Sequence, residues 1–218
     1  MTNEAIKLAV ITGGHSFNVP EFRHLFERLE GVKAYIQHLD DFATASKEIR
    51  ESYDALLFYI MMMDGPSDDE PGFRGKPKTV LEQLGNSAQG IIVMHHGLLA
   101  YPDWSLWNDL VGIENRNLQS YEHDIGLNIK VVNPDHPITR GLSDWHMVDE
   151  TYELQDPLPS VNTLLSVSAP KSMQTLAWTH SFKQSCVFCL QLGHDQRAWQ
   201  NPHFQALLGN GIHWTCHP

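Results

Sequence analysis

Residues 90–97 constrain the fold of this chain more than any other stretch, because a fully apolar run there stops at two histidines and a glycine. The run Gly-Ile-Ile-Val-Met has no polar alternation, which fits a strand of a parallel sheet that is covered on both faces. His95 and His96 follow it directly. Ligands of open α/β sheets collect beyond the carboxyl ends of the strands, so we expect His95 to be a functional residue.

Apolar runs earlier in the chain alternate with segments of helical periodicity. The expected strands before residue 90 are 7–12, 32–39 and 53–60, and the expected helices are 19–30, 43–52 and a short one near 80–84. This alternation predicts a parallel, doubly wound sheet. After the fourth strand a further helix is expected, with Asp103 as its N-cap and Gly112 as its stop.

Residues 65–78 are dense in Pro, Gly and Asp and are therefore expected to form a loop. Because the loop follows the third strand, it is expected either to border or cover a site or to be a disordered acidic segment.

Beyond Gly112 the chain is richer in strands and less regular. Strands are expected at 127–132, 146–154, 163–167, 176–178 and 186–192, and a last helix begins at Asn201 and Pro202. These strands are expected to extend the sheet and to add antiparallel pairs. No repeat or break in composition divides the chain, so residues 1–218 are expected to form a single α/β domain.

The charge balance argues against two classes of partner. Asp and Glu number 26 against 15 Lys and Arg, without a basic cluster, so no nucleic acid and no anionic membrane is expected as a partner. A small neutral or polar ligand fits better. No segment has the length of a membrane span and residues 1–7 have no signal-peptide pattern, so a cytoplasmic location is expected. A homodimer is the expectation from base rates alone.

The 3 cysteines are an odd count without a disulfide framework, which suits a reducing compartment. Cys186 and Cys189 lie three apart within an expected strand, so their side chains point to opposite faces. They are expected to be buried side chains rather than a redox or zinc pair.

Three expected strand ends carry polar side chains that suit chemistry. They are His15 after the first strand, Asp64 after the third and His95 after the fourth. Parallel topology brings such ends to one edge of the sheet, so these side chains are expected to converge.

Two later positions join this group on weaker grounds. Glu150, with Tyr152 close by, follows an apolar and aromatic stretch, and His194 and Asp195 directly follow a strand and a glycine. Aromatic side chains near expected loops suit a sugar ring, although core packing explains each one separately: Tyr101, Trp104, Tyr152, Trp178 and Trp199.

The segment around His95 has the pattern of a nucleophile elbow, in which a strand, a sharp turn with a glycine and a helix project one side chain upward. Imidazole does not readily replace the acylated serine or cysteine of such an elbow. General acid–base chemistry or metal ligation remains for His95, since a neutral imidazole suits both. His96 would point the opposite way and is expected to be structural.

The histidines also suggest a metal centre. His15, His95 and His194, with Glu150 nearby, would satisfy a divalent metal such as zinc and leave one position open. No H-x-x-x-H or H-x-H spacing is present among them, so the site depends on tertiary convergence. The alternative is a set of hydrogen-bonded or exposed histidines.

Taken in order, these motifs resemble the trehalose-utilisation (ThuA-like) family, whose fold is that of class I glutamine amidotransferases. The matching pieces are Gly13-Gly14-His15, the strand from Gly90 to His95, Asp103-Trp104, Leu110-Val111-Gly112, His136-Pro137-Ile138-Thr139, Gly141-Leu142, Asp149-Glu150-Thr151-Tyr152, Ala177-Trp178, Leu192-Gly193-His194-Asp195, Asn201-Pro202 and Gly211-Ile212 with Trp214.

The resemblance implies a flavodoxin-like three-layer sandwich with additional antiparallel strands in the C-terminal half, and a histidine where amidotransferases carry the nucleophilic cysteine. It implies a role with trehalose or related disaccharides, including 3-keto sugars, and no glutamine hydrolysis. The family's marked positions fall on His95, Glu150, Tyr152 and His194, and also on His15. Residues 178–187 depart from the family's glycine-rich turn.

Three functions are therefore open. The first is a sugar-processing enzyme of hydrolase or lyase type, in which His95, Glu150 and His194 are catalytic and a second set binds substrate: His15, Asp64, Trp104, Tyr152 and Asp195. The second is a non-catalytic sugar-binding or regulatory module on an amidotransferase scaffold. The third is a metal-dependent hydrolase of another substrate.

Overall fold

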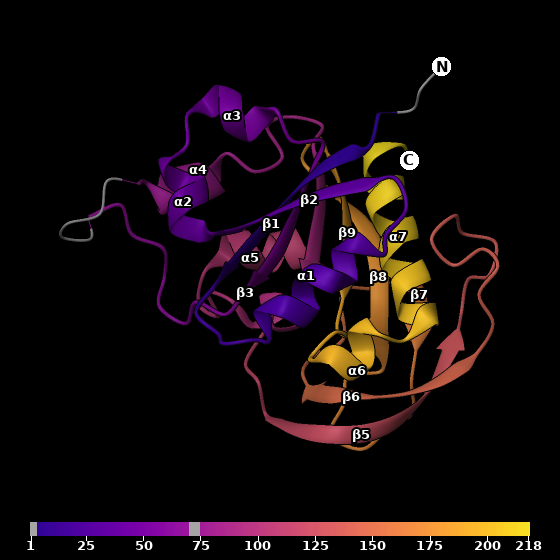
Figure 1. Cartoon of the computed structure of the whole chain (residues 1–218). Helices are drawn as coiled ribbons and strands as arrows, with labels where there is room; N and C mark the ends of the chain where they lie inside the picture. Colours follow the sequence, from indigo (N-terminus) through magenta and orange to yellow (C-terminus); the bar gives the residue numbers. More distant parts are fainter. Residues whose placement is uncertain (1–3, 70–74) are drawn as a thin grey trace.

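Nine strands form one mixed sheet in the computed structural model, which describes residues 4–69 and 75–218 (Figure 1). Their order across the sheet is β2-β1-β3-β4-β9-β8-β7-β5-β6. The strands are β1 (Ile6–Gly13), β2 (Val32–His38), β3 (Ala55–Ile60), β4 (Gly90–Met94), β5 (Ser120–Val131), β6 (Trp145–Glu153), β7 (Asn162–Ser166), β8 (Thr175–Phe182) and β9 (Ser185–Leu190).

Parallel pairing joins β2, β1, β3, β4 and β9, and every later pair is antiparallel. The predicted α/β fold with a parallel core and antiparallel C-terminal strands is thus confirmed. β3 and β4 are buried along their whole length, which explains why their sequences show no polar alternation.

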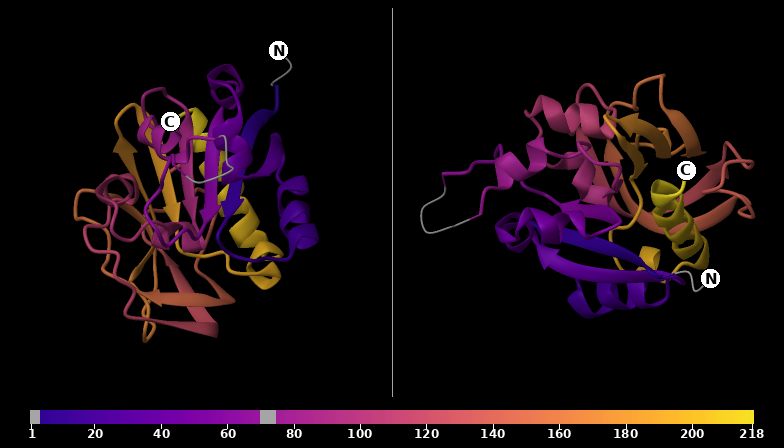
Figure 2. Two further views of the ribbon diagram at one scale, coloured as in Figure 1. Left: turned by 90° about the vertical axis from the view of Figure 1, so that its left-hand side faces the viewer. Right: turned by 90° about the horizontal axis from the view of Figure 1, so that it is seen from above.

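Helices cover both faces of the parallel part and give three layers (Figure 2). One face packs against α1 (Val19–Glu27), α6 (Gln196–Trp199) and α7 (Pro202–Cys216). The other packs against α2 (Leu39–Thr44), α4 (Pro77–Glu82) and α5 (Ser105–Val111). Alternate residues of each strand feed the two cores, so that Leu57 faces the first and Phe58 the second.

Three elements differ from the sequence predictions. The helix expected at 43–52 is two helices, α2 and α3 (Lys47–Glu51), because Ala45 is extended and the Ser46 side chain caps the second helix. The segment directly after β4 is a 3-10 helix, η1 (His95–Leu99), and α5 starts only at Ser105. β5 begins at Ser120 rather than near residue 127, because its polar first half pairs with β6.

β5 and β6 form a ribbon that lies across the lower end of the sheet in Figure 1, beside α6. Their pairing shifts register between Glu122 and Ile125, and Asp124 within this bulge has a φ of 63°. The ribbon therefore bends at residues 123–124 toward the end of the parallel strands.

Part of the expected loop 65–78 lies outside the described residues, namely 70–74. The described part is tied to the start of α4, because the Asp68 carboxylate accepts hydrogen bonds from the backbone N–H groups of Lys78 and Thr79.

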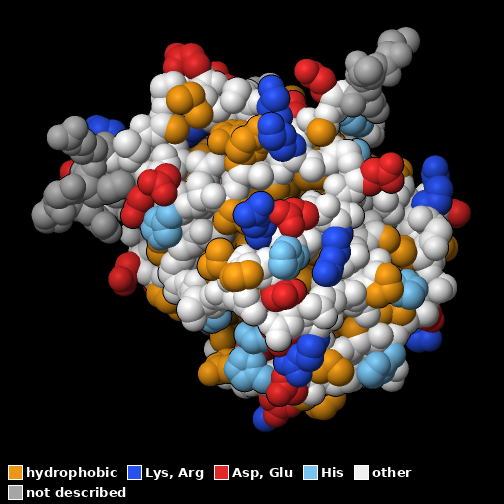
Figure 3. Space-filling model, viewed as in Figure 1, with side chains coloured by type: hydrophobic (Ala, Val, Ile, Leu, Met, Phe, Trp, Pro, Cys, Tyr) orange, Lys and Arg blue, Asp and Glu red, His pale blue; other side chains and the backbone are white. Residues whose placement is uncertain are grey.

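Surface charge and helix hydrophobicity are the features that relate to nucleic acid and membrane partners. On the face shown in Figure 3, basic and acidic side chains are interspersed. None of the helices formed by residues 4–69 and 75–218 combines the length and apolarity that a membrane crossing requires. The 3 cysteines are free, and Cys189 is buried.

Candidate active site

His95 occupies a strained turn at the carboxyl end of β4. Its φ of 55° lies in the left-handed region, which residues other than glycine rarely adopt. A Cβ on Gly97 would lie 2.7 Å from the carbonyl oxygen of Phe58, so glycine lets the turn pass this close to β3. The Trp107 indole donates to the Gly97 carbonyl oxygen at 2.9 Å. The turn therefore holds one imidazole in the place that a nucleophile elbow gives to its nucleophile.

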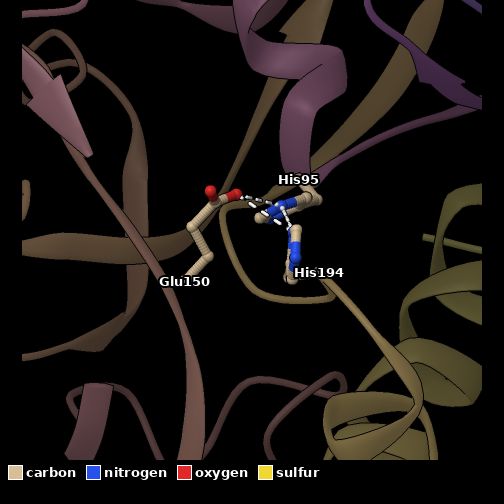
Figure 4. A group of neighbouring side chains, drawn as sticks. All are labelled: His95, Glu150 and His194. Atoms are coloured by element: carbon tan, nitrogen blue, oxygen red, sulfur yellow. Dashed lines mark hydrogen bonds and ion pairs between the residues drawn. The ribbon is translucent and has the colours of Figure 1, made fainter. Parts of the chain in front are cut away.

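Three side chains from distant parts of the chain meet at this turn (Figure 4). Nε2 of His95 lies 2.9 Å from Oε2 of Glu150 and 3.2 Å from Nδ1 of His194, and the last two atoms are 3.1 Å apart. Glu150 comes from β6, and His194 comes from the segment between β9 and α6. The structure thus brings together the three residues that the sequence analysis assigned to catalysis.

The backbone determines where the His95 ring carries its hydrogen. Nδ1 lies 2.7 Å from the carbonyl oxygen of Gln191, which only accepts, so Nδ1 donates to it. In the neutral ring, Nε2 then presents its lone pair to the cluster. The Tyr152 hydroxyl lies 2.7 Å from Nε2 and 2.8 Å from Oε2 of Glu150. The Tyr152 hydroxyl can donate its one hydrogen to only one of these two acceptors at a time. A further proton or a cation between His95 and Glu150 would satisfy the other.

The cluster favours an ionised Glu150 beside a protonated His194. Burial alone would raise the pKa of Glu150, but hydrogen bonds from His194 and Tyr152, together with the adjacent His95 ring, outweigh it and hold this pKa well below its ordinary range. The hydrogen bond with Glu150 raises the pKa of His194, against the opposing effect of burial. Glu150 thus stays charged, and His194 keeps its proton to higher pH than a free imidazole.

Asp149 holds the strand that carries Glu150 against the segment that carries His194. Its fully buried carboxylate accepts N–H bonds from Glu150, Gly193 and His194 at 2.9, 2.7 and 3.0 Å. Burial raises the pKa of Asp149, and these three donors oppose the rise. Asp149 is therefore a positioning residue, which the sequence analysis did not single out.

A fourth histidine at the site, His123, was also missed. Its Nδ1 lies 3.1 Å from Oε1 of Glu150, so Glu150 binds His123 with one oxygen and the buried cluster with the other. His123 belongs to the β5 bulge, in a polar stretch that carries no strand-like alternation. The only sequence signal is a histidine next to acids, which is also typical of an exposed loop.

A cavity of about 170 Å³ opens beside the cluster. Glu150 and Tyr152 line it, together with His15 and His123, whereas His95 is fully buried and does not. His15 therefore lies at the site, as the sequence suggested, and burial lowers its pKa. Larger cavities elsewhere, such as one of about 250 Å³ near Arg50, contain none of the clustered residues.

His96 has a structural place, as expected. Its Nδ1 lies 3.2 Å from the carbonyl oxygen of Ile60, and its ring packs 4.0 Å from that of Tyr59 and 4.7 Å from that of His15. Burial lowers the pKa of His96 to about 2, with a smaller contribution from the neighbouring His95. His96 is therefore a neutral packing residue beneath the site.

The other residues predicted to bind substrate lie elsewhere. Asp195 caps α6 by accepting from the backbone N–H of Arg197 at 2.8 Å. Trp104 packs against Tyr101 and Trp107 and does not line the cavity. Asp64 is exposed in the loop after β3, and no hydrogen bond joins it to the described residues of the cluster.

Core packing, the alternative given for each aromatic side chain, holds for two tryptophans. Trp178 and Trp199 are buried in the core and do not line the cavity.

The group of metal-ligating atoms also differs in one member from the predicted set. Among residues 4–69 and 75–218, His95, Glu150 and His194 form such a group, with their ligand atoms within 4.8 Å of one another. His15 is not part of it. The Glu150 carboxylate takes the third position, with Oε2 at 2.9 Å from Nε2 of His95 and 3.1 Å from Nδ1 of His194.

The fold and site define an amidotransferase-like α/β protein in which an imidazole and a carboxylate stand at the elbow. A family model described as trehalose utilisation, ThuA, matches residues 15–215, and the chain belongs to this family. The family supports a role in carbohydrate utilisation. A search of curated proteins gave no match.

Solved structures agree with this fold. A ThuA-like protein from Parabacteroides merdae is 18% identical, with a TM-score of 0.72 over 98% of this chain and 90% of that one. One from Bacteroides uniformis is 16% identical, with a TM-score of 0.73 over 96% and 91%. The PurLQS structure from Thermotoga maritima is 14% identical, with a TM-score of 0.62 over 96% and 99%. These similarities show a shared fold.

Proposed function

We propose that this protein is an enzyme of sugar utilisation that transfers a proton on a trehalose-related or 3-keto disaccharide. The meeting of His95, Glu150 and His194 within 3.2 Å of one another, beside a cavity, carries the proposal. The family supports a small carbohydrate as the ligand.

Glu150 and His95 act as one unit in this proposal. A ketone makes the adjacent C–H bond of a sugar acidic, so the reaction needs a base at that carbon. Glu150 lines the cavity and accepts the proton from the sugar carbon. The proton then passes from Oε2 of Glu150 to Nε2 of His95, which lies 2.9 Å away. The products of this step are an enolate of the sugar and an imidazolium beside a carboxylate. Because the imidazole is the final acceptor, the low pKa of Glu150 does not prevent the transfer.

His194 is placed to return a proton. Its Nδ1 faces Oε2 of Glu150 at 3.1 Å, and its side chain is 21% exposed, against 0% for His95. The raised pKa of His194 keeps it protonated over a wider pH range. His194 protonates a departing or enolate oxygen, and the proton held by His95 then passes to Nδ1 of His194 across 3.2 Å, which restores both rings and completes the acid–base cycle.

Turnover of a 3-keto disaccharide, followed by NMR of the products, tests the proposal. His95→Ala and Glu150→Gln should each lower the rate by about 100-fold or more. His24→Ala removes an exposed histidine of α1 and should leave the rate unchanged. Turnover by a folded His95→Ala protein at the parent rate would refute the assignment. Stabilisation by sugars, with no product after long incubation, would support a non-catalytic sugar-binding module instead.

The same three side chains favour a second candidate, a metal-dependent hydrolase. Ligands at about 2.0–2.1 Å from a tetrahedral zinc lie roughly 3.3 Å apart, close to the spacing of this group. The Nδ1 of His95 donates to a backbone carbonyl oxygen, as the second nitrogen of metal-bound histidines does. His95, Glu150 and His194 would hold the ion, which would activate a water molecule.

Elemental analysis of protein purified without chelator or added metal separates the two candidates. The second candidate predicts about one divalent ion per chain, and Glu150→Gln should lose it. A chain without bound metal that still turns over the keto sugar would exclude the second candidate and retain the first.

A further inference from the structure

The lining of the cavity combines two kinds of side chain. Glu150 and His123 are polar, whereas Met61, Leu99 and Leu118 are apolar. A sugar ring has the same division, with an apolar C–H face and a rim of hydroxyl groups. The cavity therefore matches the substrate class of the proposed function, on which this inference rests.

Tyr121 is a further residue of the cavity lining. It lies directly opposite Tyr152 in the β5–β6 ribbon, so both side chains leave the ribbon on the same face. Tyr152 is buried in the cluster, whereas Tyr121 is 56% exposed although it lines the cavity. Its ring contributes little to the core, and its exposed face is free to stack on a sugar ring.

His123 lies two residues further along the same strand and beside the same ring. The two ring centroids are 5.4 Å apart and the ring planes are nearly perpendicular, at 80°. The His123 side chain is 53% exposed, and Nδ1 is held 3.1 Å from Oε1 of Glu150. Nε2 of His123 is therefore available to a ligand while Nδ1 fixes the ring.

Ion pairs on both neighbours hold this part of the bulge in place. Glu122 pairs with Lys171 at 2.5 Å, and Asp124 pairs with Arg197 of α6. Arg197 also binds Asp195, next to His194. Exposed pairs contribute little to folding, but two of them on either side of His123 restrict where its ring lies.

We propose that Tyr121 and His123 form a sugar-binding subsite of this enzyme. The Tyr121 ring stacks on the C–H face of one sugar unit, and His123 hydrogen-bonds a hydroxyl of that unit. The bound unit is thereby presented to Glu150, which lines the same cavity.

Calorimetric titration of trehalose into the inactive His95→Ala protein tests the subsite without turnover. In this background Tyr121→Ala should weaken binding about 3- to 10-fold, and Tyr121→Phe should not, because stacking needs the ring and not the hydroxyl. His123→Ala should weaken binding about 3- to 10-fold, with partial rescue by His123→Gln. His24→Ala is the matched control, and thermal unfolding verifies that each variant is folded.

Two outcomes separate this inference from the proposed function. Unchanged trehalose affinity in both Tyr121→Ala and His123→Ala overturns the subsite, even if His95→Ala abolishes turnover in the parent. Binding that depends on Tyr121, in a parent protein that forms no product, supports the subsite and refutes the proposed chemistry.

Discussion

The end of the parallel sheet and the β5–β6 ribbon supply opposite halves of one site, and they are held by different forces. His95 is fully buried, and backbone geometry fixes it through a positive φ and a hydrogen bond to Gln191. His123 is half exposed, and surface ion pairs flank it. Backbone constraints tolerate little displacement, whereas exposed ion pairs yield at small cost. The sheet end therefore holds its histidine more rigidly than the ribbon does, and the predictions below test that difference.

Asp149 joins the two halves, and its replacement should have the largest effect. Asp149→Asn leaves one acceptor oxygen for three backbone N–H groups and adds a donor that faces them. We expect a loss of about 3 kcal/mol in the free energy of unfolding and a large loss of turnover. Chemical denaturation measures the first effect. Asp144→Asn is the control and should cost much less, because this exposed carboxylate accepts from one backbone N–H group and from the exposed Lys130 side chain.

A change at Gly97 tests the rigidity of the sheet end. Gly97→Ala brings a Cβ to 2.7 Å from the Phe58 carbonyl oxygen, so the turn of His95 must shift. We expect a loss of about 1–3 kcal/mol and a lower kcat, with a smaller effect on sugar affinity. Gly65→Ala is a suitable control, because its Cβ would meet no atom within 4 Å. An unchanged kcat in Gly97→Ala would show that the turn geometry does not matter.

A histidine outside both regions, His180, should contribute to the pH dependence of stability. It lies in β8, where burial lowers its pKa and Nε2 donates to the Leu110 carbonyl oxygen. As the pH falls, His180 takes up a proton in the unfolded chain at a higher pH than in the folded chain. The stability that the neutral His180 contributes is therefore complete above about pH 6.5 and is lost as the pH falls below that value.

The variant His180→Gln should therefore flatten the decline in stability at acidic pH, by at most about 1.4 kcal/mol per pH unit. Denaturation at pH 7 and pH 5 measures the slope. His24→Gln should leave it unchanged, and an unaltered slope in His180→Gln would contradict the prediction. The fraction of protein unfolded at each pH because of His180 needs to be corrected for before the pH profile of turnover is assigned to the residues of the site.

The smallest effect on stability is expected for the pair that anchors the ribbon. Arg197→Ala removes the contacts with Asp124, which is exposed, and with Asp195, which is partly exposed, and should cost less than about 1 kcal/mol. It should nevertheless weaken trehalose binding by loosening the bulge. Equal sugar affinity in Arg197→Ala and the parent would show that His123 needs no support from α6.

Much of the parallel half could be predicted because local signals and burial agree there. The apolar runs that became β1, β3 and β4 lie in a sheet covered on both faces, and no polar residue interrupts them. His95 stood out because it is the first polar side chain after the apolar run of residues 90–94, at the end of the strand. Glu150 and His194 joined the prediction on weaker local patterns and through the family resemblance, because parallel topology alone predicted the convergence of His15, Asp64 and His95.

The ribbon half was less predictable, because its exposed strand has a polar sequence. Residues 120–126 read Ser-Tyr-Glu-His-Asp-Ile-Gly, which resembles a loop as much as a strand. Only pairing with β6 makes them a strand, and only the bulge turns His123 toward Glu150. The contact between Asp124 and Arg197 spans 73 positions, which no local pattern encodes.

The sequence by itself determined the strand ends, the histidine at the elbow and the absence of an acylated nucleophile there, because these depend on the order of apolar and polar residues. The tertiary structure decided that His95 lies behind Glu150, that Glu150 joins the ligand group in place of His15, and that Tyr121 and His123 border the cavity. These features depend on how an antiparallel ribbon packs across a parallel sheet, and that packing is set by contacts between residues far apart in the chain.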